Sequence, residues 1–348
     1  MPSGPEQLTT EWLSEALGAN VTSFDCEQIG IGVGLLGRLF RITMAIEGSG
    51  AKTAVAKFAT LDEGARMNVA EPLNFYEKEV RFYQQAAQEI PVATPQVYVA
   101  EHDPATRDFV LLLEDLGDRR MEDQIAGCSI EDARTAVDAL VALHSAKWES
   151  DFPAWLPSYS DPPFPQVIQG MYKQAWPQAL EIVAGHLSPQ MREFGERYVE
   201  IVDWFMAELG HKPWTMCHGD FRLDNLFFGS TPDHAPVTIV DWQIAFRGRA
   251  GYDVAYFVSQ SLPTDVRRSH EQSLKDRYLE GLAKNGIDYP SEEFEKDYAR
   301  TIAYCFIYPV VSAGQIEMTN ERMRELILGI LDRSVQAIVD NDALAILI

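Results

Sequence analysis

The sequence predicts an α+β protein of two lobes, an N-terminal antiparallel sheet followed by a larger, mostly helical part. Between residues 21 and 113, short β-branched or apolar runs alternate with turn residues, and one helical stretch lies among them. From residue 130 onward, apolar residues recur at helical spacing. With 348 residues the chain is long enough for two such units. We expect an N-terminal lobe at residues 1–116 and a C-terminal lobe at residues 117–348.

Composition and charge exclude several classes of protein. The chain has 29 Lys and Arg against 52 Asp and Glu, a net charge of -23 that opposes binding to nucleic acid. No apolar run approaches the ~20 residues of a membrane helix, and no signal peptide is visible. The four cysteines are widely spread and form no C-x-x-C pair, which indicates reduced thiols and a cytoplasmic protein. The oligomeric state stays open.

The first elements are a short helix and two strands. Thr10–Leu17 is helical in pattern, with Thr9 or Thr10 as its cap and Gly18 as its stop. Val21–Ile29 and Leu39–Ile46 have the pattern of strands.

A glycine-rich segment, GIGVGLLGR, lies between these two strands, and Gly32, Gly34 and Gly37 spell G-x-G-x-x-G. Glycine allows backbone N–H groups to approach phosphate closely, both in kinase loops and in dinucleotide turns. A dinucleotide turn opens a helix and has an acidic residue about 20 positions later. Here a strand follows, and Lys57 occupies that later position. The pattern therefore favours a phosphate-covering hairpin; a dinucleotide-dependent oxidoreductase and a hairpin without function remain alternatives.

Lys57 follows the apolar strand Thr53–Ala56, and the next helical stretch, Leu73–Gln85, carries Glu77 and Glu79. A lysine at the end of a strand either extends its ammonium to water or binds phosphate beside a carboxylate. Two further strands are expected at Gln96–Ala100 and Phe109–Leu113.

The apolar run at Phe109–Leu113 is typical of a strand that is buried on both faces. It leads into Glu114–Gly117, where we expect the lobe boundary.

The C-terminal part is predominantly helical. The segment Asp151–Pro165 is too rich in proline for regular helix. Its Trp155, Tyr159 and Phe164 either form a wall of a substrate pocket or pack against the lobe. The expected helices are Ile130–Trp148, Gln166–Ile182, Pro189–Leu209, Asp265–Ala283, Glu292–Ala313 and Asn320–Ile338.

The residues with the clearest chemical pattern lie in CHGDFRLDNLFF, residues 217–228, and TIVDWQ, residues 238–243. Asn225 stands five positions after Asp220, and Asp241 follows a β-branched run that predicts a buried strand. Phosphoryl transfer needs a group that orients and deprotonates a hydroxyl, and hard oxygen ligands for Mg²⁺. Asp and Asn are also common turn residues, which is the alternative interpretation.

The stretch HGDFRLDN followed by VDWQ resembles the aminoglycoside phosphotransferase family of the protein-kinase-like superfamily, and most of all its ecdysteroid-kinase and choline-kinase-like branch. This resemblance implies a two-lobed kinase-like fold. It implies that Asp220 is the catalytic base and that Arg222 stabilises charge on the transferred phosphoryl group. It assigns Asn225 and Asp241 to Mg²⁺.

The resemblance also implies an ATP site. Gly32 and Gly34 would cover the phosphates, and Lys57 would contact them, steadied by Glu79 or, failing that, by Glu77. Backbone groups of Glu114–Leu116 would meet the adenine.

Two residues are given structural tasks in this interpretation. His218 is expected to make an orienting hydrogen bond within the loop. Asp253, in GYDVAYF, is expected to brace the loop from the following helix.

The acceptor is expected to be a hydroxyl of a small molecule. Only nine residues separate Asp241 from Gly251, and no A-P-E motif follows, which leaves no room for the activation segment of a protein kinase. The sequence therefore predicts an ATP- and Mg²⁺-dependent phosphotransferase. A nucleotide-binding regulator without transfer is the alternative, and the acceptor's identity is open.

Overall fold

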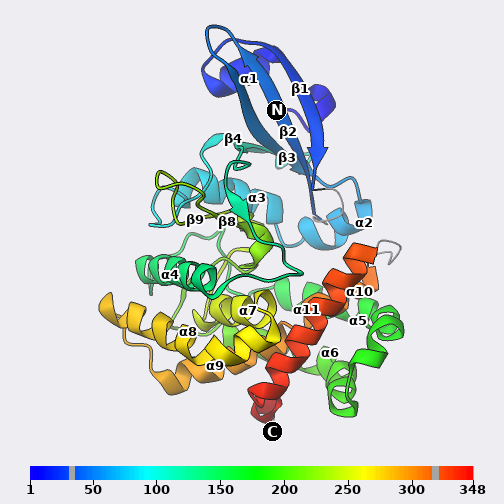
Figure 1. The fold of residues 1–348 in the computed structure, drawn as a ribbon. Coiled ribbons are helices and arrows are strands. Elements are labelled where there is room, and N and C mark those ends of the chain that lie inside the picture. The colour runs from blue at the N-terminus through cyan, green and yellow to red at the C-terminus, as the bar shows by residue number, and fades with distance from the viewer. Residues whose placement is uncertain (31–35, 316–320, 348) are drawn as a thin grey trace.

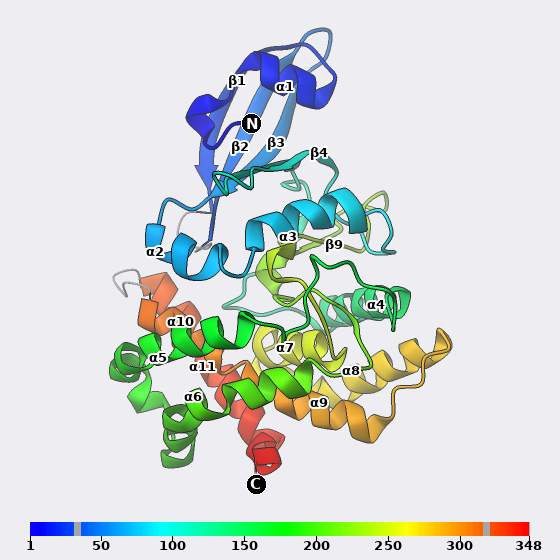
Figure 2. The ribbon, with the colours of Figure 1, turned by 180° about the vertical axis from the view of Figure 1, so that it is seen from behind.

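The computed structural model describes residues 1–30, 36–315 and 321–347. A five-stranded antiparallel sheet lies at the N-terminal end of the molecule, and the long C-terminal helices lie at the opposite end (Figure 1). Helix α3 lies between the two parts, as the view from behind also shows (Figure 2). The predicted α+β organisation in two lobes is confirmed.

The N-terminal sheet is built from consecutive hairpins except at one edge, where β5 inserts between β3 and β4. One face of the sheet packs on a small core that includes Leu13 of α1 (Thr10–Leu17) and Ile42. The strands, in their order across the sheet, are β1 (Val21–Ile29), β2 (Gly37–Ile46), β3 (Ala51–Ala59), β5 (Phe109–Glu114) and β4 (Val97–His102).

Helix α1 has the predicted bounds and caps. The Thr9 side chain accepts a hydrogen bond from Trp12 N, and Gly18 ends the helix in the left-handed conformation, with φ of 62°. Both devices satisfy backbone groups that the helix itself leaves unpaired.

Strand β3 is longer than predicted, so that Lys57 lies within it and not at its end. The β2–β3 ladder continues from Ala45↔Ala51 to Gly37↔Ala59. Because side chains alternate along a strand, Lys57 faces the side opposite to Ala56 and Phe58, which pack into the small core. The face that carries Lys57 is the one toward α3, whose Glu79 bonds the lysine.

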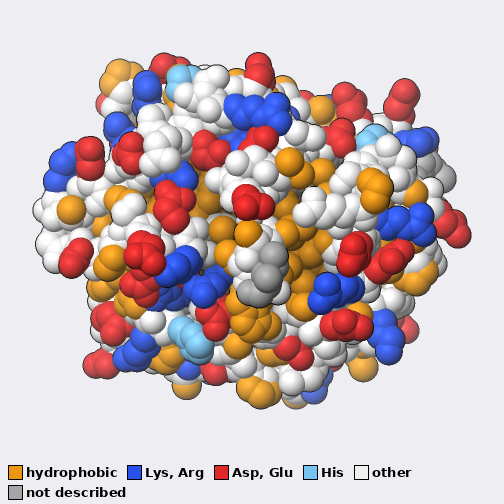
Figure 3. Space-filling model, turned by 90° about the horizontal axis from the view of Figure 1, so that it is seen from below, with side chains coloured by type: hydrophobic (Ala, Val, Ile, Leu, Met, Phe, Trp, Pro, Cys, Tyr) orange, Lys and Arg blue, Asp and Glu red, His pale blue; other side chains and the backbone are white. Residues whose placement is uncertain are grey.

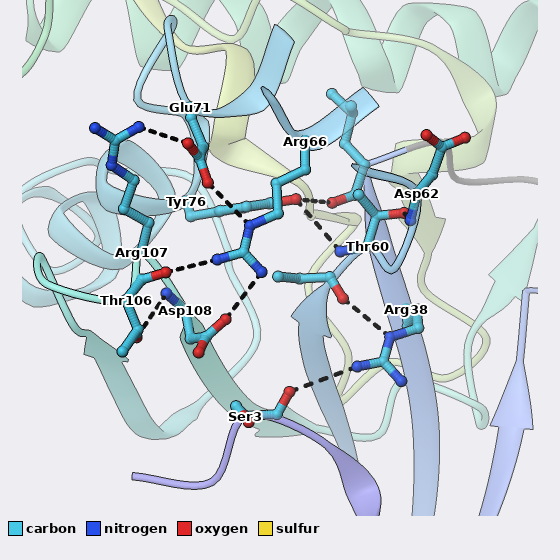
Figure 4. Close-up of polar contacts among 12 residues, drawn as sticks. Ser3, Arg38, Thr60, Asp62, Arg66, Glu71, Tyr76, Thr106, Arg107 and Asp108 are labelled. Carbon is cyan, nitrogen blue, oxygen red and sulfur yellow. Dashed lines mark hydrogen bonds and ion pairs between the residues drawn. The ribbon is translucent and has the colours of Figure 1, made fainter. Parts of the chain in front are cut away.

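The chain between β3 and α3 forms two short turns, α2 (Glu63–Ala65) and the π-helical η2 (Arg66–Ala70). Figure 4 shows how Arg66 connects them to the rest of the lobe: its guanidinium bonds Glu71 at 3.0 Å, Asp108 at 3.0 Å and the Thr106 carbonyl at 2.7 Å. This network fixes the segment that leads into α3.

Helix α3 spans Phe75–Arg81 and continues as a π-helical turn, η3 (Phe82–Ala86). The prediction began two residues earlier; Asn74, at φ of 51°, is left-handed and sets the true start.

The helical part follows the predicted order of helices, with two corrections. Phe164 and Pro165, from the segment that was expected not to be helical, form the start of the helix predicted at Gln166–Ile182. Glu292–Ala313 was expected as one helix, but it divides after Tyr304 and resumes at Ile307. Pro309 explains the break, because its ring clashes with the carbonyl four residues earlier, that of Cys305. The helices are α4 (Ile130–Ala146), α5 (Phe164–Val183), α6 (Pro189–Leu209), α7 (Gly251–Ser261), α8 (Thr264–Lys284), α9 (Ser291–Tyr304), α10 (Ile307–Gln315) and α11 (Glu321–Asp340).

The aromatic residues singled out in the segment Asp151–Pro165 are mainly core residues. Tyr159 and Phe164 are 2% and 3% exposed, and the Tyr159 ring stacks on Phe246 at 4.2 Å. Trp155 is partly buried and donates to Gln85. The packing alternative therefore holds for Tyr159 and Phe164.

The surface near the C-terminus carries acidic and basic side chains interspersed with hydrophobic ones (Figure 3). On this face the excess negative charge does not gather into one field. Among the described residues, none of the helices is both long and apolar enough to cross a membrane.

Candidate active site

The loop that carries Asp220 is fixed by the buried carboxylate of Asp253 in α7. Strand β7 (Thr215–Cys217) pairs with β10 (Phe246–Gly248) and delivers the chain to the loop. Asp253 accepts hydrogen bonds from the backbone N–H of His218 at 2.7 Å and of Gly219 at 2.9 Å. His144 Nε2 lies 3.1 Å from the same carboxylate. Asp253 thus occupies the bracing position expected from the sequence.

Gly219 allows the loop to pass close to the chain that follows Asp241. Its φ is +87°, and a Cβ on this residue would lie 2.7 Å from the carbonyl oxygen of Ile244. His218 adds two further hydrogen bonds: its Nε2 donates to the Val240 carbonyl at 2.9 Å, and its Nδ1 accepts from Asp220 N at 3.2 Å. The close approach at Gly219 and the hydrogen bonds of His218 together fix the backbone conformation of the loop.

The carboxylate of Asp220 is held at both oxygens and still reaches solvent. Asn225 Nδ2 donates to Oδ2 at 3.0 Å, and the Tyr256 hydroxyl donates to Oδ1 at 2.8 Å. Arg222 Nε lies 3.5 Å from Oδ1, and the Asp220 side chain is 18% exposed. A carboxylate in this arrangement is oriented and accessible, as a general base must be.

Asn225 and Asp241 are brought to one end of a small hairpin. Strands β8 (Leu226–Phe228) and β9 (Val237–Ile239) pair with Leu226 opposite Ile239, so the residues flanking them lie side by side. Val240 N donates to the Asn225 carbonyl at 3.1 Å. The Asn225 amide nitrogen donates to Asp220, and the side-chain oxygen of Asn225 could coordinate a cation. Together with the Asp241 carboxylate, it is the type of hard-oxygen donor that suits Mg²⁺.

Lys57 connects β3, α3 and the loop after β9. Its Nζ donates to Glu79 Oε1 at 2.9 Å and to Asp241 Oδ1 at 3.0 Å. Glu77, the fallback partner, instead pairs with Arg81 on the same helix. Burial raises the pKa of Glu79 to about 7, although Lys57 acts in the opposite direction. Burial would lower the pKa of Lys57, but the carboxylates of Asp241 and Glu79 outweigh it, and the ammonium stays charged.

Helix α3 is fixed against the loop after Asp241 by two further contacts. The Phe82 and Trp242 rings stack at 4.0 Å with an interplanar angle of 9°. The ammonium of Lys78, which is 2% exposed, lies 3.3 Å from the Ala245 carbonyl and over the Phe75 and Phe164 rings. Burial lowers the pKa of Lys78 well below its usual range.

Of the expected phosphate-covering glycines, Gly32 and Gly34 lie outside the described residues. Gly37 begins β2, and a Cβ there would lie 3.0 Å from Lys57 Cε. The absence of a side chain at Gly37 therefore leaves space for the Lys57 side chain. The Tyr76 hydroxyl of α3 donates to the Leu36 carbonyl at 2.8 Å, next to the glycine segment.

The two residues expected to meet adenine lie at the connection between the lobes. Glu114 is the last residue of β5, and its side chain bonds Arg119 and the backbone N–H of Gln96. Leu116 is 4% exposed. Between them, Asp115 forms an ion pair with Arg41 of β2 at 2.8 Å, a contact that the sequence did not reveal.

Two other site residues were missed. Tyr256 bonds Asp220, and buried Gln124 accepts from Leu223 N at 3.0 Å within the same loop. Tyr256 stands three residues after Asp253, one helical turn along the same face of α7, and this spacing was a usable signal. Gln124 lies in a loop, and its position offered no such signal.

A sheet with one main helix on a helical lobe, with a Lys57–Glu79 pair in contact with Asp241, defines the protein-kinase-like class of fold. Residues 32–288 match the model of the ecdysteroid kinase-like family, and the chain belongs to that family.

Solved structures agree with this fold. Choline kinase from Cryptosporidium parvum has a TM-score of 0.54 at 10% identity, over 99% of this chain and 95% of that one. The gentamicin complex of APH(2″)-IIa has a TM-score of 0.50 at 15% identity, over 97% of both chains. At such identities the likeness concerns the fold alone.

One curated relative also matches. It is a probable acyl-CoA dehydrogenase, IBR3, from Arabidopsis thaliana, which is 29% identical over 111 residues. The match covers 30% of this chain and only 13% of that protein, so no activity of the whole relative follows for this chain.

Proposed function

We propose that this protein transfers the γ-phosphoryl group of ATP, with Mg²⁺, to a hydroxyl of a small molecule. The observation that carries the proposal is the double contact of Lys57 with Glu79 and Asp241. Through it the expected phosphate-binding lysine and an expected metal ligand share one site.

Asp220 is the proposed base. Its carboxylate accepts the hydrogen bond of the acceptor hydroxyl, orients that oxygen toward the phosphorus and takes its proton as the bond forms. Its partial exposure leaves room for an acceptor, and Asn225 and Tyr256 fix its orientation.

Arg222 is the proposed stabiliser of the transferred group. Its guanidinium lies between the carboxylates of Asp220, at 3.5 Å, and Asp224, at 3.1 Å. Burial acts against its charge, but these neighbouring carboxylates raise the pKa of Arg222, so it remains a cation beside the base. A fixed cation there lowers the energy of charge that develops on phosphoryl oxygens.

Asn225 and Asp241 would bind Mg²⁺ through their side-chain oxygens, and the ion would neutralise charge on the phosphates. Lys57 would bind the non-transferred phosphates, with Glu79 holding its ammonium in place, and the backbone of Glu114–Leu116 would meet adenine.

Family membership favours a small-molecule acceptor, and so does the short segment after Asp241, in which η6 (Trp242–Ile244) and β10 lead directly into α7. No extended surface loop for a protein substrate intervenes there.

The test is transfer of labelled γ-phosphate from ATP with Mg²⁺ into pooled aminoglycosides, choline-like amines, sugars and steroid alcohols. Asp220→Asn keeps the shape of the side chain and removes the base. Asp138→Asn is the matched control, because Asp138 forms an exposed ion pair with Arg277 and contacts none of the proposed site residues in the described structure.

A product that the wild type and Asp138→Asn form, and that Asp220→Asn forms about 10²–10⁴-fold more slowly, supports the proposal and identifies the acceptor class. Binding of ATP and Mg²⁺ without any transfer would favour the nucleotide-binding regulator. Failure to bind ATP would refute the proposed function.

A further inference from the structure

Two side chains of helix α7 form hydrogen bonds with the Asp220 loop, and bracing of the backbone explains only one of them. Asp253 bonds the N–H groups of His218 and Gly219. One turn later, the Tyr256 hydroxyl donates directly to Asp220 Oδ1 at 2.8 Å. The second contact is made to the reacting carboxylate itself.

The Tyr256 side chain has little freedom to move. It is 2% exposed, and its ring packs at 4.8 Å from that of Tyr308 in α10. The Tyr308 hydroxyl in turn bonds that of Tyr252 on α7. The hydroxyl of Tyr256 is thus presented to Asp220 by a packed aromatic cluster and not by a mobile side chain.

The proton of Tyr256 stays on its oxygen. Burial, followed by the negative charge of Asp220, raises the pKa of Tyr256 well above its usual range. The hydroxyl is therefore a donor to Asp220 and not a second base.

We propose that Tyr256 is a positioning residue for phosphoryl transfer: its hydroxyl holds Asp220 Oδ1 so that the carboxylate faces the acceptor hydroxyl. This inference rests on the proposed function. Asn225 holds the other oxygen, and the two donors together define the plane of the carboxylate. A base that must accept a proton along one direction gains from such orientation, because misplacement by about 1 Å can cost about 10²-fold in rate.

The sharpest test compares two Tyr→Phe variants within the same aromatic cluster. Tyr256→Phe removes the hydroxyl that bonds Asp220. Tyr304→Phe removes a buried hydroxyl that bonds Tyr159 at 2.6 Å. Steady-state release or transfer of γ-phosphate from MgATP is measured for both variants, for the wild type and for Asp220→Asn. The affinity for ATP is measured for the same proteins.

We expect Tyr256→Phe to lower kcat by about tenfold, with the KM for ATP changed by less than about twofold. Tyr304→Phe should match the wild type in both respects.

Equal kcat values for the two Phe variants would overturn the inference while the proposed function stands. So would a loss of ATP affinity in Tyr256→Phe that parallels its loss of kcat, since that result shows a general structural role. If the wild type has no turnover that depends on Asp220, the proposed function fails, and the inference fails with it.

Discussion

The ammonium of Lys57 lies 3.0 Å from the carboxylate of Asp241, across 184 positions of sequence. The proposed phosphate-binding cation and a proposed metal ligand thus form an ion pair. When MgATP binds, Lys57 would pair with phosphate and Asp241 with Mg²⁺. Each charged group would then exchange one partner of opposite charge for another.

Replacing Lys57 should weaken nucleotide binding. Lys57→Met keeps the length of the side chain but leaves the buried Glu79 without its cation, and we expect the Kd for ATP to rise by about tenfold or more. Titration calorimetry measures it. Lys52→Met, on the same strand but at its exposed end, is the matched control. An unchanged Kd in Lys57→Met would contradict the proposed role of Lys57.

Asp241→Asn should raise the concentration of Mg²⁺ that is needed for activity. An amide oxygen is a weaker ligand than a carboxylate, and we expect the half-saturating Mg²⁺ concentration to rise by about tenfold, with kcat lowered as well. Phosphate transfer measured against Mg²⁺ concentration checks it, with exposed Asp118→Asn as control. An unshifted Mg²⁺ curve would exclude Asp241 as a ligand.

Glu79 should make stability depend on pH near neutrality. Its pKa of about 7 in the folded protein exceeds the value of about 4.3 in an unfolded chain, so the folded state binds the proton more tightly and loses stability as pH rises between these values. Glu79→Gln does not titrate. Relative to this variant, the wild-type free energy of unfolding should fall from about pH 5 to about pH 7, by at most about 1.4 kcal/mol per unit, and then level off.

Urea unfolding at several pH values measures this difference. Glu77→Gln is the matched control for removing a carboxylate from α3, because Glu77 is partly exposed beside Arg81. A wild-type free energy of unfolding that rises with pH relative to that of Glu79→Gln would contradict the prediction.

Gly219→Ala should be more disruptive than an alanine at another left-handed glycine. Both Gly219 and Gly286 have positive φ, of +87° and +78°, but only at Gly219 would a Cβ meet backbone, 2.7 Å from Ile244 O. We expect Gly286→Ala to cost about 1 kcal/mol of stability, and Gly219→Ala about 2–4 kcal/mol with most activity lost.

Thermal unfolding of both glycine variants makes the comparison. Equal losses of stability would show that the loop yields to the added methyl group.

Much of the fold followed from local pattern. The bounds of α1, β1 and α6 are as predicted, because capping residues and the spacing of apolar side chains act over a few neighbouring residues. The errors were also local in cause. Pairing with β2 extends β3 past Lys57 as far as Ala59. Pro309 divides the helix expected at Glu292–Ala313.

The candidate site divides in the same way. The sequence alone determined which residue types the Asp220 loop and the Asp241 turn offer, because a motif of a few residues fixes its own chemistry. Only the tertiary structure decided that Glu79 and not Glu77 meets Lys57, and that Tyr256 and Gln124 reach the loop. These contacts join segments 22 to 99 positions apart, and burial and packing of whole elements, which no local pattern encodes, select them.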